Sequence, residues 1–362
     1  MIKIDGSYLE GGGQIARTAL ALSTLTGKPF EVDNIRKGRC DSGLKAQHLY
    51  CVRALEELCN AKAEGVKLGS TYLRYFPGRI KGKTISIDIG TAGSISLLLQ
   101  AVLLPSMFAD SKVRLKITGG TDGKWAQPYD YFVKVFLPQI EKFVDGIDVE
   151  LVKRGYYPKG DGKVDIKISP KYKLIDFMDF NEFYNFLKSD ENNNLNYNLI
   201  EQGRLKNIYG VSHASKFLEK SEVAERQAKA AKYELTKLNV PVKIKTEYHD
   251  TASTGSGIVL WAEYENGRVA GDSLGEQGRR AEIVGKEAAE NLMEEIKSGA
   301  PVDKYLADQI LPFMALTPNS KIKVSKVTNH TKTNIYVVEK FLDVKFELDG
   351  DIIKTLSSKM PS

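Results

Sequence analysis

A glycine-rich stretch near the start of the chain contains the first residues that could do chemistry. Three consecutive glycines, Gly11 to Gly13, stand directly before a predicted helix, with Glu10 before them and Arg17 one turn into that helix. Glycines at this position expose backbone N–H groups at a helix N-terminus, a geometry that binds phosphate. The Glu10 carboxylate is a hard ligand for a divalent cation, and the Arg17 guanidinium can pair with an anion. No Gly-Lys-Ser/Thr follows, so this is not a Walker A loop; a plain glycine turn before a capped helix stays equally open.

A basic segment lies farther along the chain. Arg36-Lys37-Gly38-Arg39 follows a predicted strand, and Gln47 and His48 belong to the helix that comes next. Cations clustered at a strand–helix junction can hold phosphate groups. The residues alone favour a solvated charged loop over such a site. His48 by itself is more typical of a packing or hydrogen-bonding histidine than of a catalyst.

A histidine near the other end of the chain could act as a nucleophile. His330 lies just before an apolar stretch with helical spacing, among hydroxyl and amide side chains. An imidazole there can attack an electrophilic phosphorus through one nitrogen while a carboxylate or carbonyl holds the other. Asp308 is the candidate for that carboxylate. A capping or structural role for His330 is the alternative that the residues leave open.

One further motif has a plain structural interpretation. Lys159-Gly160-Asp161-Gly162 has the K-x-D-G form in which nucleic-acid ligases adenylate the lysine. It joins the predicted strands Asp148–Lys153 and Lys163–Ile168, and Asp-Gly is a strong hairpin signal. Those ligases also need a downstream Glu-Gly motif, whereas the Glu-Gly pairs of this chain, at Glu10 and Glu64, lie upstream. We therefore expect an ordinary hairpin.

The elements that must position these residues alternate between strand and helix. A period of two predicts strands, and apolar residues spaced by three and four predict helices. We interpret three stretches as copies of one loop–helix–strand unit, although any α/β protein yields some such matches by chance. The copies start at Gly12, Gly90 and His330 and end with the strands Phe30–Ile35, Val113–Thr118 and Val344–Leu348.

The middle of the chain has a different composition. Asp176–Asn198 contains an Asn-rich polar run, which predicts a linker or an exposed, mobile loop. From Gly203 onward a β-α-β-β-α pattern of about 100 residues could bury a small core of its own. We therefore expect an α/β fold with a large catalytic domain of three repeated α/β units, residues 1–173 and 300–362. A smaller α/β domain, residues 174–299, would be inserted into it.

Composition limits the class of protein. The 362 residues are 42% hydrophobic and 27% charged, with a net charge of +6, which permits an anionic partner without proving one. We see no apolar run near the roughly 18 residues that a membrane helix needs. The three cysteines, Cys40, Cys51 and Cys59, exclude a disulfide framework and favour a reducing, cytoplasmic location.

Taken together, these motifs resemble the RNA 3′-terminal phosphate cyclase family. The resemblance runs in order over nearly the whole chain, and it is more specific than any single motif. It is carried by Asp5–Ser7, Glu10–Gln14, Arg17, Arg36–Arg39, Gln47-His48, Gly90–Ser94, Gly119–Asp122, Tyr305–Gln309, His330 and Thr333-Asn334.

The resemblance implies a reaction. Members of the family convert an RNA 3′-phosphate to a 2′,3′-cyclic phosphodiester with ATP. By that resemblance His330 Nε2 would attack the α-phosphorus of ATP and form a histidine–AMP intermediate. AMP would then pass to the RNA 3′-phosphate, and the vicinal 2′-OH would expel it.

The resemblance also implies roles for particular residues. The nucleotide contacts would come from Gln100, Tyr305, Leu306, Ala307, Asp308 and Gln309, with Tyr305 stacking on adenine. Asp308 would position His330 or the ribose, and Glu10 would take Mg²⁺ or Mn²⁺. Phosphates of ATP or RNA would be bound by Arg17, Arg36, Arg39 and Gln47 together with Gly12 and Gly13.

Three other functions compete with this interpretation. The main one is a non-catalytic relative that serves as an RNA or ribosome-assembly scaffold; such relatives lack the nucleophilic histidine, which is present here as His330. A lysine-adenylating RNA ligase would act through Lys159. An enolpyruvyl transferase shares only similar repeated α/β units, which is an analogy of fold alone. The physiological RNA and the oligomeric state, including a homo-oligomer, stay open.

Overall fold

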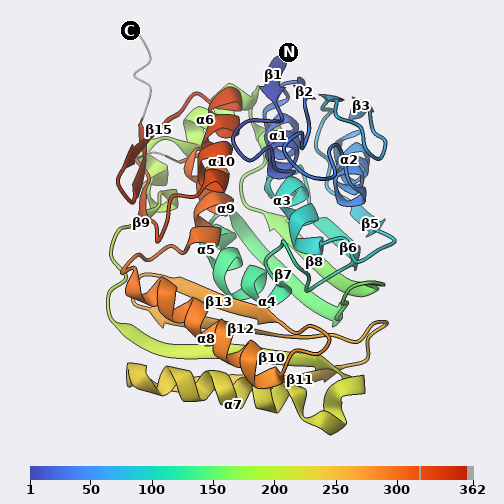
Figure 1. The fold of residues 1–362 in the computed structure, drawn as a ribbon. Helices are drawn as coiled ribbons and strands as arrows, with labels where there is room; N and C mark the ends of the chain where they lie inside the picture. The colour runs from blue at the N-terminus through green and yellow to red at the C-terminus, as the bar shows by residue number, and fades with distance from the viewer. Residues whose placement is uncertain (318, 357–362) are drawn as a thin grey trace.

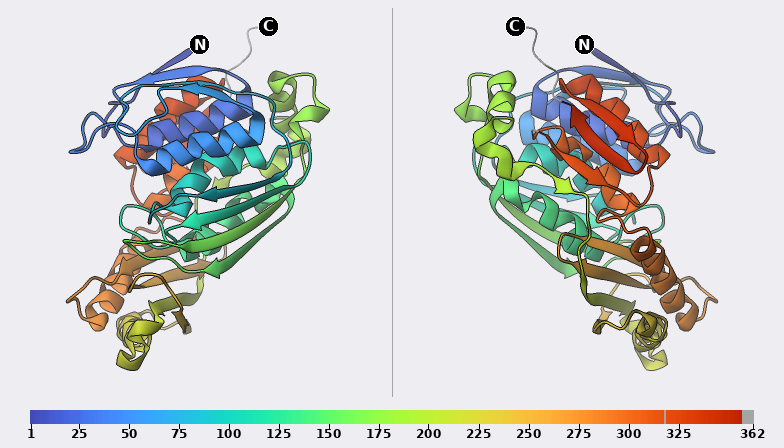
Figure 2. Two further views of the ribbon diagram at one scale, coloured as in Figure 1. Left: turned by 90° about the vertical axis from the view of Figure 1, so that its right-hand side faces the viewer. Right: turned by 90° about the vertical axis from the view of Figure 1, so that its left-hand side faces the viewer.

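The computed structural model of the protein describes residues 1–317 and 319–356. In these residues the strands form four mixed sheets of four strands each. Figure 1 shows three of the sheets in the upper part of the molecule, with a group of helices between them. The fourth sheet lies at the lower end with two helices of its own, and the side views of Figure 2 show the same arrangement.

The first sheet comes from the N-terminal part of the chain. Its strands run in the order β1-β2-β4-β3, and only the β1–β2 pair is parallel. Its helix α1 stops at Gly27, whose φ of 71° is left-handed and suits glycine. The elements are β1 (Ile2–Asp5), α1 (Gln14–Thr26), β2 (Phe30–Asp33), α2 (Ala46–Cys59), β3 (Lys62–Glu64) and β4 (Leu73–Phe76).

The second sheet repeats this strand order as β5-β6-β8-β7, again with one parallel pair. The spacing of residues 128–143 predicts a single helix, and the structure has a continuous helical segment there that is interrupted by a π-helical turn between α4 and α5. Pro138 has no N–H to donate to the carbonyl of Lys134, which accepts a hydrogen bond from Arg268 at 3.0 Å instead. The elements are β5 (Thr84–Asp88), α3 (Ile95–Ser106), β6 (Val113–Gly119), α4 (Tyr129–Tyr131), the π-helix Phe132–Phe136, α5 (Leu137–Ile140), the 3₁₀ turn Glu141–Phe143, β7 (Val144–Lys153) and β8 (Gly162–Pro170).

The third sheet has the same order, β9-β14-β16-β15, with β9 and β14 parallel. In this order α9 stands where α1 and α3 stand in the other sheets. The third copy expected from the sequence starts at His330. The strand order shows that this copy should start one helix earlier in the chain, at α9. The elements are β9 (Asn198–Leu199), α9 (Lys304–Met314), β14 (Lys321–Lys323), α10 (Asn329–Phe341), β15 (Lys345–Asp349) and β16 (Ile352–Leu356).

The fourth sheet, in the order β11-β10-β12-β13, is formed by residues between β9 and α9. Along β12, Ile258 and Leu260 belong to a core shared with α7 and α8, whereas Val259 and Trp261 belong to the main core. This alternation buries both faces of the sheet. The elements are β10 (Leu205–Ser215), the 3₁₀ turn Lys216–Ser221, α7 (Val223–Leu235), the 3₁₀ turn Thr236–Leu238, β11 (Val242–His249), β12 (Ser256–Tyr264), β13 (Arg268–Leu274) and α8 (Ala281–Lys297). The sequence pattern had missed β13.

The linker expected over Asp176–Asn198 is wrong, because this segment is structured and packs on the main core. It forms α6 (Phe180–Leu187), between 3₁₀ turns at Leu174–Asp176 and Asp190–Leu195. Phe183, Tyr184 and Leu187 are buried in the main core. Phe180 and these three side chains have the i, i+3, i+4, i+7 spacing of an amphipathic helix, which the polar run after them obscured.

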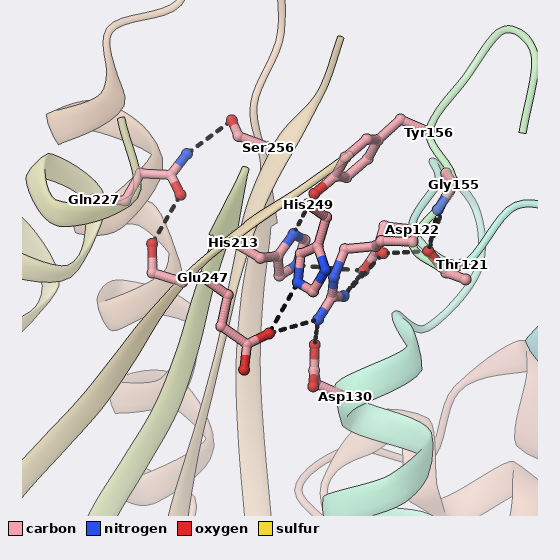
Figure 3. Close-up of polar contacts among 12 residues, drawn as sticks. Thr121, Asp122, Asp130, Gly155, Tyr156, His213, Gln227, Glu247, His249 and Ser256 are labelled. Carbon is pink, nitrogen blue, oxygen red and sulfur yellow. Dashed lines mark hydrogen bonds and ion pairs between the residues drawn. The ribbon is translucent and has the colours of Figure 1, made fainter. Parts of the chain in front are cut away.

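A buried ion cluster joins the second and fourth sheets (Figure 3). The Arg154 guanidinium, 0% exposed, donates to Asp122 at 3.0 Å and to Asp130 at 2.9 Å. From the fourth sheet, His213 Nε2 lies 3.3 Å from Asp122, a contact too poorly directed to count as a hydrogen bond. Burial acts to raise the pKa of Asp122, but Arg154 and His213 outweigh it and hold that pKa below its usual range.

This cluster does not need a metal ion. Asp122, Asp130 and His213 present ligand atoms within 4.8 Å of one another. The Arg154 guanidinium already donates to both carboxylates, so it supplies the positive charge that they require.

A second contact links the fourth sheet to the start of α9. The buried Asp303 caps this helix by accepting from the N–H groups of Tyr305 and Leu306 at 3.0 and 2.8 Å. Its other oxygen accepts from the N–H of Ala270 on β13 at 3.1 Å. The position of α9 therefore depends on its own N-terminal cap and on a contact from β13 of the fourth sheet.

Two expectations about the whole chain can be compared with the structure. The three cysteines are free thiols, as predicted, with Cys40 exposed and the other two buried. In the described residues, we find no helix with the length and apolar character required to cross a membrane.

Replacing Arg154 should show how much the ion cluster contributes to the free energy of unfolding. We expect Arg154→Met to lower the free energy of unfolding by about 3–5 kcal/mol, because Asp122 and Asp130 stay buried without a cation. Urea denaturation at neutral pH measures this. The matched control is Arg114→Met, whose guanidinium pairs with Asp165 at 2.6 Å but is 42% exposed; it should cost less than about 1 kcal/mol.

Equal losses in the two variants would contradict this account of the cluster. The difference between wild type and Arg154→Met should also shrink in acid. The folded-state pKa of Asp122 is depressed, so its contribution is present above the unfolded pKa of about 3.9 and is lost as the pH falls toward the folded value.

Candidate active site

His330 faces the glycine loop across a short distance. It is the second residue of α10, not part of a loop before that helix, and Thr328 caps the helix through its hydroxyl. His330 Nε2 lies 3.1 Å from Glu10 Oε2, which also accepts from Arg39 Nη2 at 3.2 Å. The helix start and the loop are held together because Gln14 Nε2 donates to the His330 carbonyl at 2.9 Å.

The surroundings of His330 favour its neutral form. Burial lowers the pKa of His330, Arg17 and Arg39 act in the same direction, and the Glu10 carboxylate opposes them. The side chain is still 45% exposed, so a ligand can reach Nε2. A neutral, accessible imidazole nitrogen beside cations has the properties of a nucleophile toward an anionic electrophile.

Arg17 places a positive charge in the interior without a paired negative charge. It is 7% exposed, and its Nε donates to Gln100 Oε1 at 3.0 Å. In the part of the chain that the structure describes, we find no carboxylate within ion-pair distance of Arg17. Burial lowers the pKa of Arg17 to about 10, so the guanidinium stays charged at neutral pH. A buried cation of this kind is costly unless an anion binds to it.

His48 adds a second donor beside Arg17. Its Nδ1 accepts from the backbone N–H of Lys45 at 2.9 Å, so the proton of the neutral ring must be on Nε2. Burial and the Arg17 charge hold the pKa of His48 well below its usual value, so the ring is neutral. Nε2 lies 3.4 Å from Arg17 Nη1, and both atoms are donors. The two groups can therefore share one bound anion, a role that spacing alone did not suggest for His48.

The glycines of the loop are needed for this packing. A Cβ on Gly13 would overlap His48 Nε2, and one on Gly12 would lie 3.8 Å from His330 Cε1 and 3.7 Å from Arg39 Nη2. Gly11 has a φ of 54°, the left-handed region that suits glycine. The loop thus lets backbone approach both histidines closely.

Asp308 lies near His330 but does not contact it in the described structure. Asn334, one turn after His330 on α10, donates to the Asp308 carbonyl at 3.0 Å and to Oδ2 at 3.4 Å. The Asn334 amide oxygen accepts from Thr18 on α1 at 2.8 Å. Burial raises the pKa of Asp308 to about 7, against the effect of Arg17. The link through Asn334 joins α1, α9 and α10, and two of its members, Thr18 and Asn334, were not assigned roles from the sequence.

The other expected nucleotide residues lie on or beside α9. Leu306 and Ala307 are buried in the core, whereas Tyr305 is 38% exposed and rests edge-on against Tyr131. Gln309 donates to the Tyr305 carbonyl at 3.0 Å. A small pocket of about 40 Å³ is lined by Thr18, Gln100, Phe132, Asp308, Gln309 and Asn334 among others. It has room for only one or two water molecules, so a nucleoside cannot fit inside it.

The remaining basic residues surround the same place. Arg36, with a φ of 58°, donates to the Asp41 carbonyl at 3.2 Å, and its buried Nε has no partner among the described residues. Burial and the nearby Arg39 lower the pKa of Arg36. Gln47 lies next to His48 at the start of α2 and beside the Gly90–Gly93 loop. The structure therefore brings Glu10, Arg17, Arg39, His48 and His330 together, with Arg36 and Gln47 close by.

Comparison with known proteins gives one consistent result. Residues 8–348 match the family described as RNA 3′-terminal phosphate cyclase. Proteins described in the same words from Pyrococcus abyssi, Archaeoglobus fulgidus and Methanopyrus kandleri are 47%, 43% and 40% identical to this chain. The alignments cover 98%, 98% and 97% of this chain, and 97%, 100% and 96% of the respective relatives.

The overlap between Gly13 and His48 gives a specific prediction. Gly13 has a φ of −65°, which alanine adopts freely, so the main penalty for Gly13→Ala should be the clash with the imidazole, and the Arg17 Nη1 atom, 3.2 Å from the added Cβ, has to shift only slightly. We expect Gly13→Ala to cost about 2–3 kcal/mol of unfolding free energy in the wild-type background. In the His48→Ala background the same substitution should cost less than about 0.5 kcal/mol.

Urea unfolding of the four proteins in this double-mutant cycle measures the coupling between the two positions. Additive losses would mean that the loop does not pack on His48 as described.

Proposed function

The chain belongs to the RNA 3′-terminal phosphate cyclase family and is a cyclase of RNA 3′-terminal phosphates, and we propose that it works through covalent adenylation of His330. The family uses ATP, which fits a site of clustered cations. His330 Nε2 attacks the α-phosphorus of ATP, an N–P bond forms, the bond to the β-phosphate oxygen breaks, and pyrophosphate leaves. The observation that carries this proposal is the half-exposed His330 side chain, whose neutral form is favoured by burial and by the charges of Arg17 and Arg39.

Two further steps complete the reaction. An oxygen of the RNA 3′-phosphate attacks the AMP phosphorus and breaks the N–P bond, which leaves an RNA–phosphate–AMP anhydride and a free His330. The vicinal 2′-OH then attacks the RNA phosphorus, loses its proton, and expels AMP. A phosphate monoester has a poor leaving group until it is activated, and the covalent intermediate divides that difficulty into separate steps.

Arg17 and His48 supply the charge stabilisation in this proposal. Phosphoryl transfer depends mainly on positioning and on neutralising the phosphate oxygens. The Arg17 Nη1 and the Nε2–H of His48 lie 3.4 Å apart and would both donate to an anion bound beside them. Arg36, Arg39 and Gln47 would bind the remaining phosphates of ATP or RNA.

A divalent cation fits at Glu10. Mg²⁺ commonly takes one or two carboxylates and completes its shell with water and substrate phosphates. Glu10 offers an accessible carboxylate beside the nucleophile, and its present contacts to His330 and Arg39 are single oxygen contacts. Mg²⁺ or Mn²⁺ bound there would neutralise phosphate charge, and Glu10 would no longer contact Nε2 of His330.

The adenosine of ATP would lie over α9. The Tyr305 ring is exposed enough to stack on adenine, and its backbone N–H is fixed by Asp303. Gln100, Asp308 and Gln309 would take the polar atoms of the nucleoside, with Leu306 and Ala307 supporting the helix from within. Asp308 acts on His330 only through Asn334 in this proposal.

We also propose that the three sheets with one strand order are repeats of a single unit and that the fourth sheet is an insertion into the third repeat. The large domain would comprise residues 1–202 and 300–362, and the insertion 203–299. The ends of the insertion meet, because Gln202 Nε2 donates to the Ala300 carbonyl at 2.7 Å. This moves the start from the expected 174, since α6 packs on the main core.

The scaffold alternative has one observation in its favour, which is the net charge of +6. It does not account for His330. Thr328 caps the helix α10, and neither this cap nor the contact to Glu10 has a structural need for an imidazole. The proposed function is therefore tested by asking whether His330 carries AMP.

His330→Ala should abolish transfer of label from [α-³²P]ATP to the protein and abolish cyclisation, while the unfolding transition stays within about 1 kcal/mol of wild type, because the side chain is half exposed. Lys159→Ala is the control and should keep the transfer of label to the protein. Label on the His330→Ala protein would refute the nucleophile, and loss of label from Lys159→Ala would favour the ligase chemistry.

Glu10→Ala should raise the Mg²⁺ or Mn²⁺ concentration that gives half-maximal adenylation by at least about tenfold, because an oxygen ligand is lost. Saturating metal should restore most of the rate. Glu64→Ala, which removes a carboxylate paired with Arg74 away from the site, is the control. An unchanged metal requirement in Glu10→Ala would place the cation elsewhere.

A further inference from the structure

A strip of surface leads away from the reacting histidine toward the fourth sheet. We propose that this strip binds the nucleotides upstream of the RNA 3′ end as a single strand. We define it as Tyr50 and Arg53 on α2, the loop Gly90–Gly93, and the exposed residues Tyr157–Lys159 between β7 and β8. The inference rests on the proposed function, because it assumes that RNA enters with its 3′-phosphate near His330.

The strip is continuous with the site of the reaction. His48 contacts Arg17 in the site, and its neighbour Gln47 packs against the glycine loop: a Cβ on Gly93 would lie 3.8 Å from the Cβ of Gln47. A Cβ on Gly90 would lie 3.8 Å from the hydroxyl of Tyr50. Neighbouring residues therefore connect the phosphate site to the start of α2 and the Gly90–Gly93 loop.

The loop connects in turn to the segment between β7 and β8. A Cβ on Gly160 would lie 2.6 Å from the Thr91 carbonyl oxygen and 2.8 Å from Ala92 Cα. Gly160 has a φ of 71°, so glycine is required both for this close approach and for the backbone conformation. The contact places Gly160, which directly follows the exposed segment Tyr157–Lys159, against Thr91 and Ala92.

The fourth sheet holds the other side of the segment in place. The N–H of Lys159 donates to Ser253 Oγ at 3.1 Å. Tyr156 donates to or accepts from His213 Nδ1 at 2.7 Å and stacks on that ring, as Figure 3 shows, and Gly255 packs against the face of Tyr156. The segment is thus fixed between two sheets, and little ordering is needed when a ligand binds.

The exposed groups are those that bind single-stranded nucleic acid. The Tyr157 side chain is 77% exposed, and Lys159 beside it is exposed. The Arg53 guanidinium lies over the Tyr50 ring, 5.0 Å from its centroid, and faces solvent. Aromatic rings on which bases stack, alternating with cations that follow the phosphates, are typical of sites that bind one strand without reading its sequence.

The carboxylates near the strip are already neutralised or engaged. Asp161 forms an ion pair with Lys153 at 2.6 Å. Asp88 accepts from the N–H of Gly90 at 2.8 Å and so shapes the loop. Glu56 on α2 acts electrostatically on Arg53, but among the described residues we find no carboxylate within ion-pair distance of Arg53 or Lys159, so both charges are available for phosphate. This gives Lys159 an electrostatic role, different from the covalent role that its K-x-D-G motif suggests.

The test compares two triple variants that lose the same chemistry at different places. Arg53→Ser/Tyr157→Ala/Lys159→Ala removes two cations and one exposed tyrosine from the strip. The matched control, Lys229→Ser/Lys232→Ser/Tyr233→Ala, removes two exposed cations and a tyrosine that is 73% exposed from α7. Both are assayed with 3′-phosphorylated RNA of three and of about ten nucleotides.

For the strip variant we expect the KM of the longer RNA to rise about tenfold or more, which is the scale of one lost base stack. The KM of the trinucleotide should stay within about twofold of wild type. The slope of log Kd against log salt concentration for the longer RNA should decrease by about 1.4, since each lost phosphate contact accounts for about 0.7. The control variant should resemble wild type in all three measurements.

Adenylation of His330 by ATP, measured on the same preparations, separates this inference from the function on which it rests. Wild-type protein that forms no adduct would refute the proposed function. Normal adenylation with an unchanged KM for the longer RNA would refute the strip alone. An equal effect on the trinucleotide would place these residues at the reacting phosphate, and an equal effect in the control would place the RNA on α7; either result would overturn the proposal.

Discussion

The buried charge of Arg17 is the constraint on which the rest of the site depends. All 13 residues of α1 are buried, so its guanidinium cannot turn toward bulk water. Its contacts are to neutral groups, Gln100 and His48, and a cation held in this way is stabilised fully only when an anion joins it. The surroundings of Arg17 suit such an anion. His48 is neutral, the backbone is open at Gly12 and Gly13, and His330 lies close to these glycines.

The architecture explains how such a helix can exist. Three sheets with the same strand order enclose the helices, and α1 packs against α3 and α10, so residues from opposite ends of the chain meet around Arg17. The fourth sheet is attached through the Arg154 cluster and through Asp303, which also caps α9. The residues on α9 that are proposed to bind the nucleotide are therefore connected to the fourth sheet through Asp303, although no expected site residue lies in that sheet.

Much of the fold could be predicted from the sequence, because alternation and helical spacing are local signals. The expected strands and helices of the first 170 residues lie within a few residues of those observed, apart from the π-helical turn that interrupts residues 128–143. Two failures had local causes, because α6 is followed by a polar run and β13 has glycine at an inner position. The third had a non-local cause, since the third copy could be aligned only once β9 was seen to pair with β14. For the site, residue types indicated Glu10, Arg17 and His330. The Asn334 link and the Arg154 cluster depend on pairs distant in sequence, so no local pattern encodes them. The tautomer of His48 is set by the nearby N–H of Lys45, which residue types alone did not reveal.

The most direct test of the central claim is the affinity for ATP when the chemistry is blocked. In His330→Ala protein, the Kd for ATP with metal can be measured by calorimetry, with and without Arg17→Met. We predict that Arg17→Met weakens ATP binding by at least about 30-fold, the loss of a charge contact of about 2 kcal/mol or more. The same change should leave the free energy of unfolding without ATP unchanged or higher, because an unpaired buried charge is removed. Unchanged ATP affinity together with a destabilised fold would show that Arg17 serves the structure and not the anion.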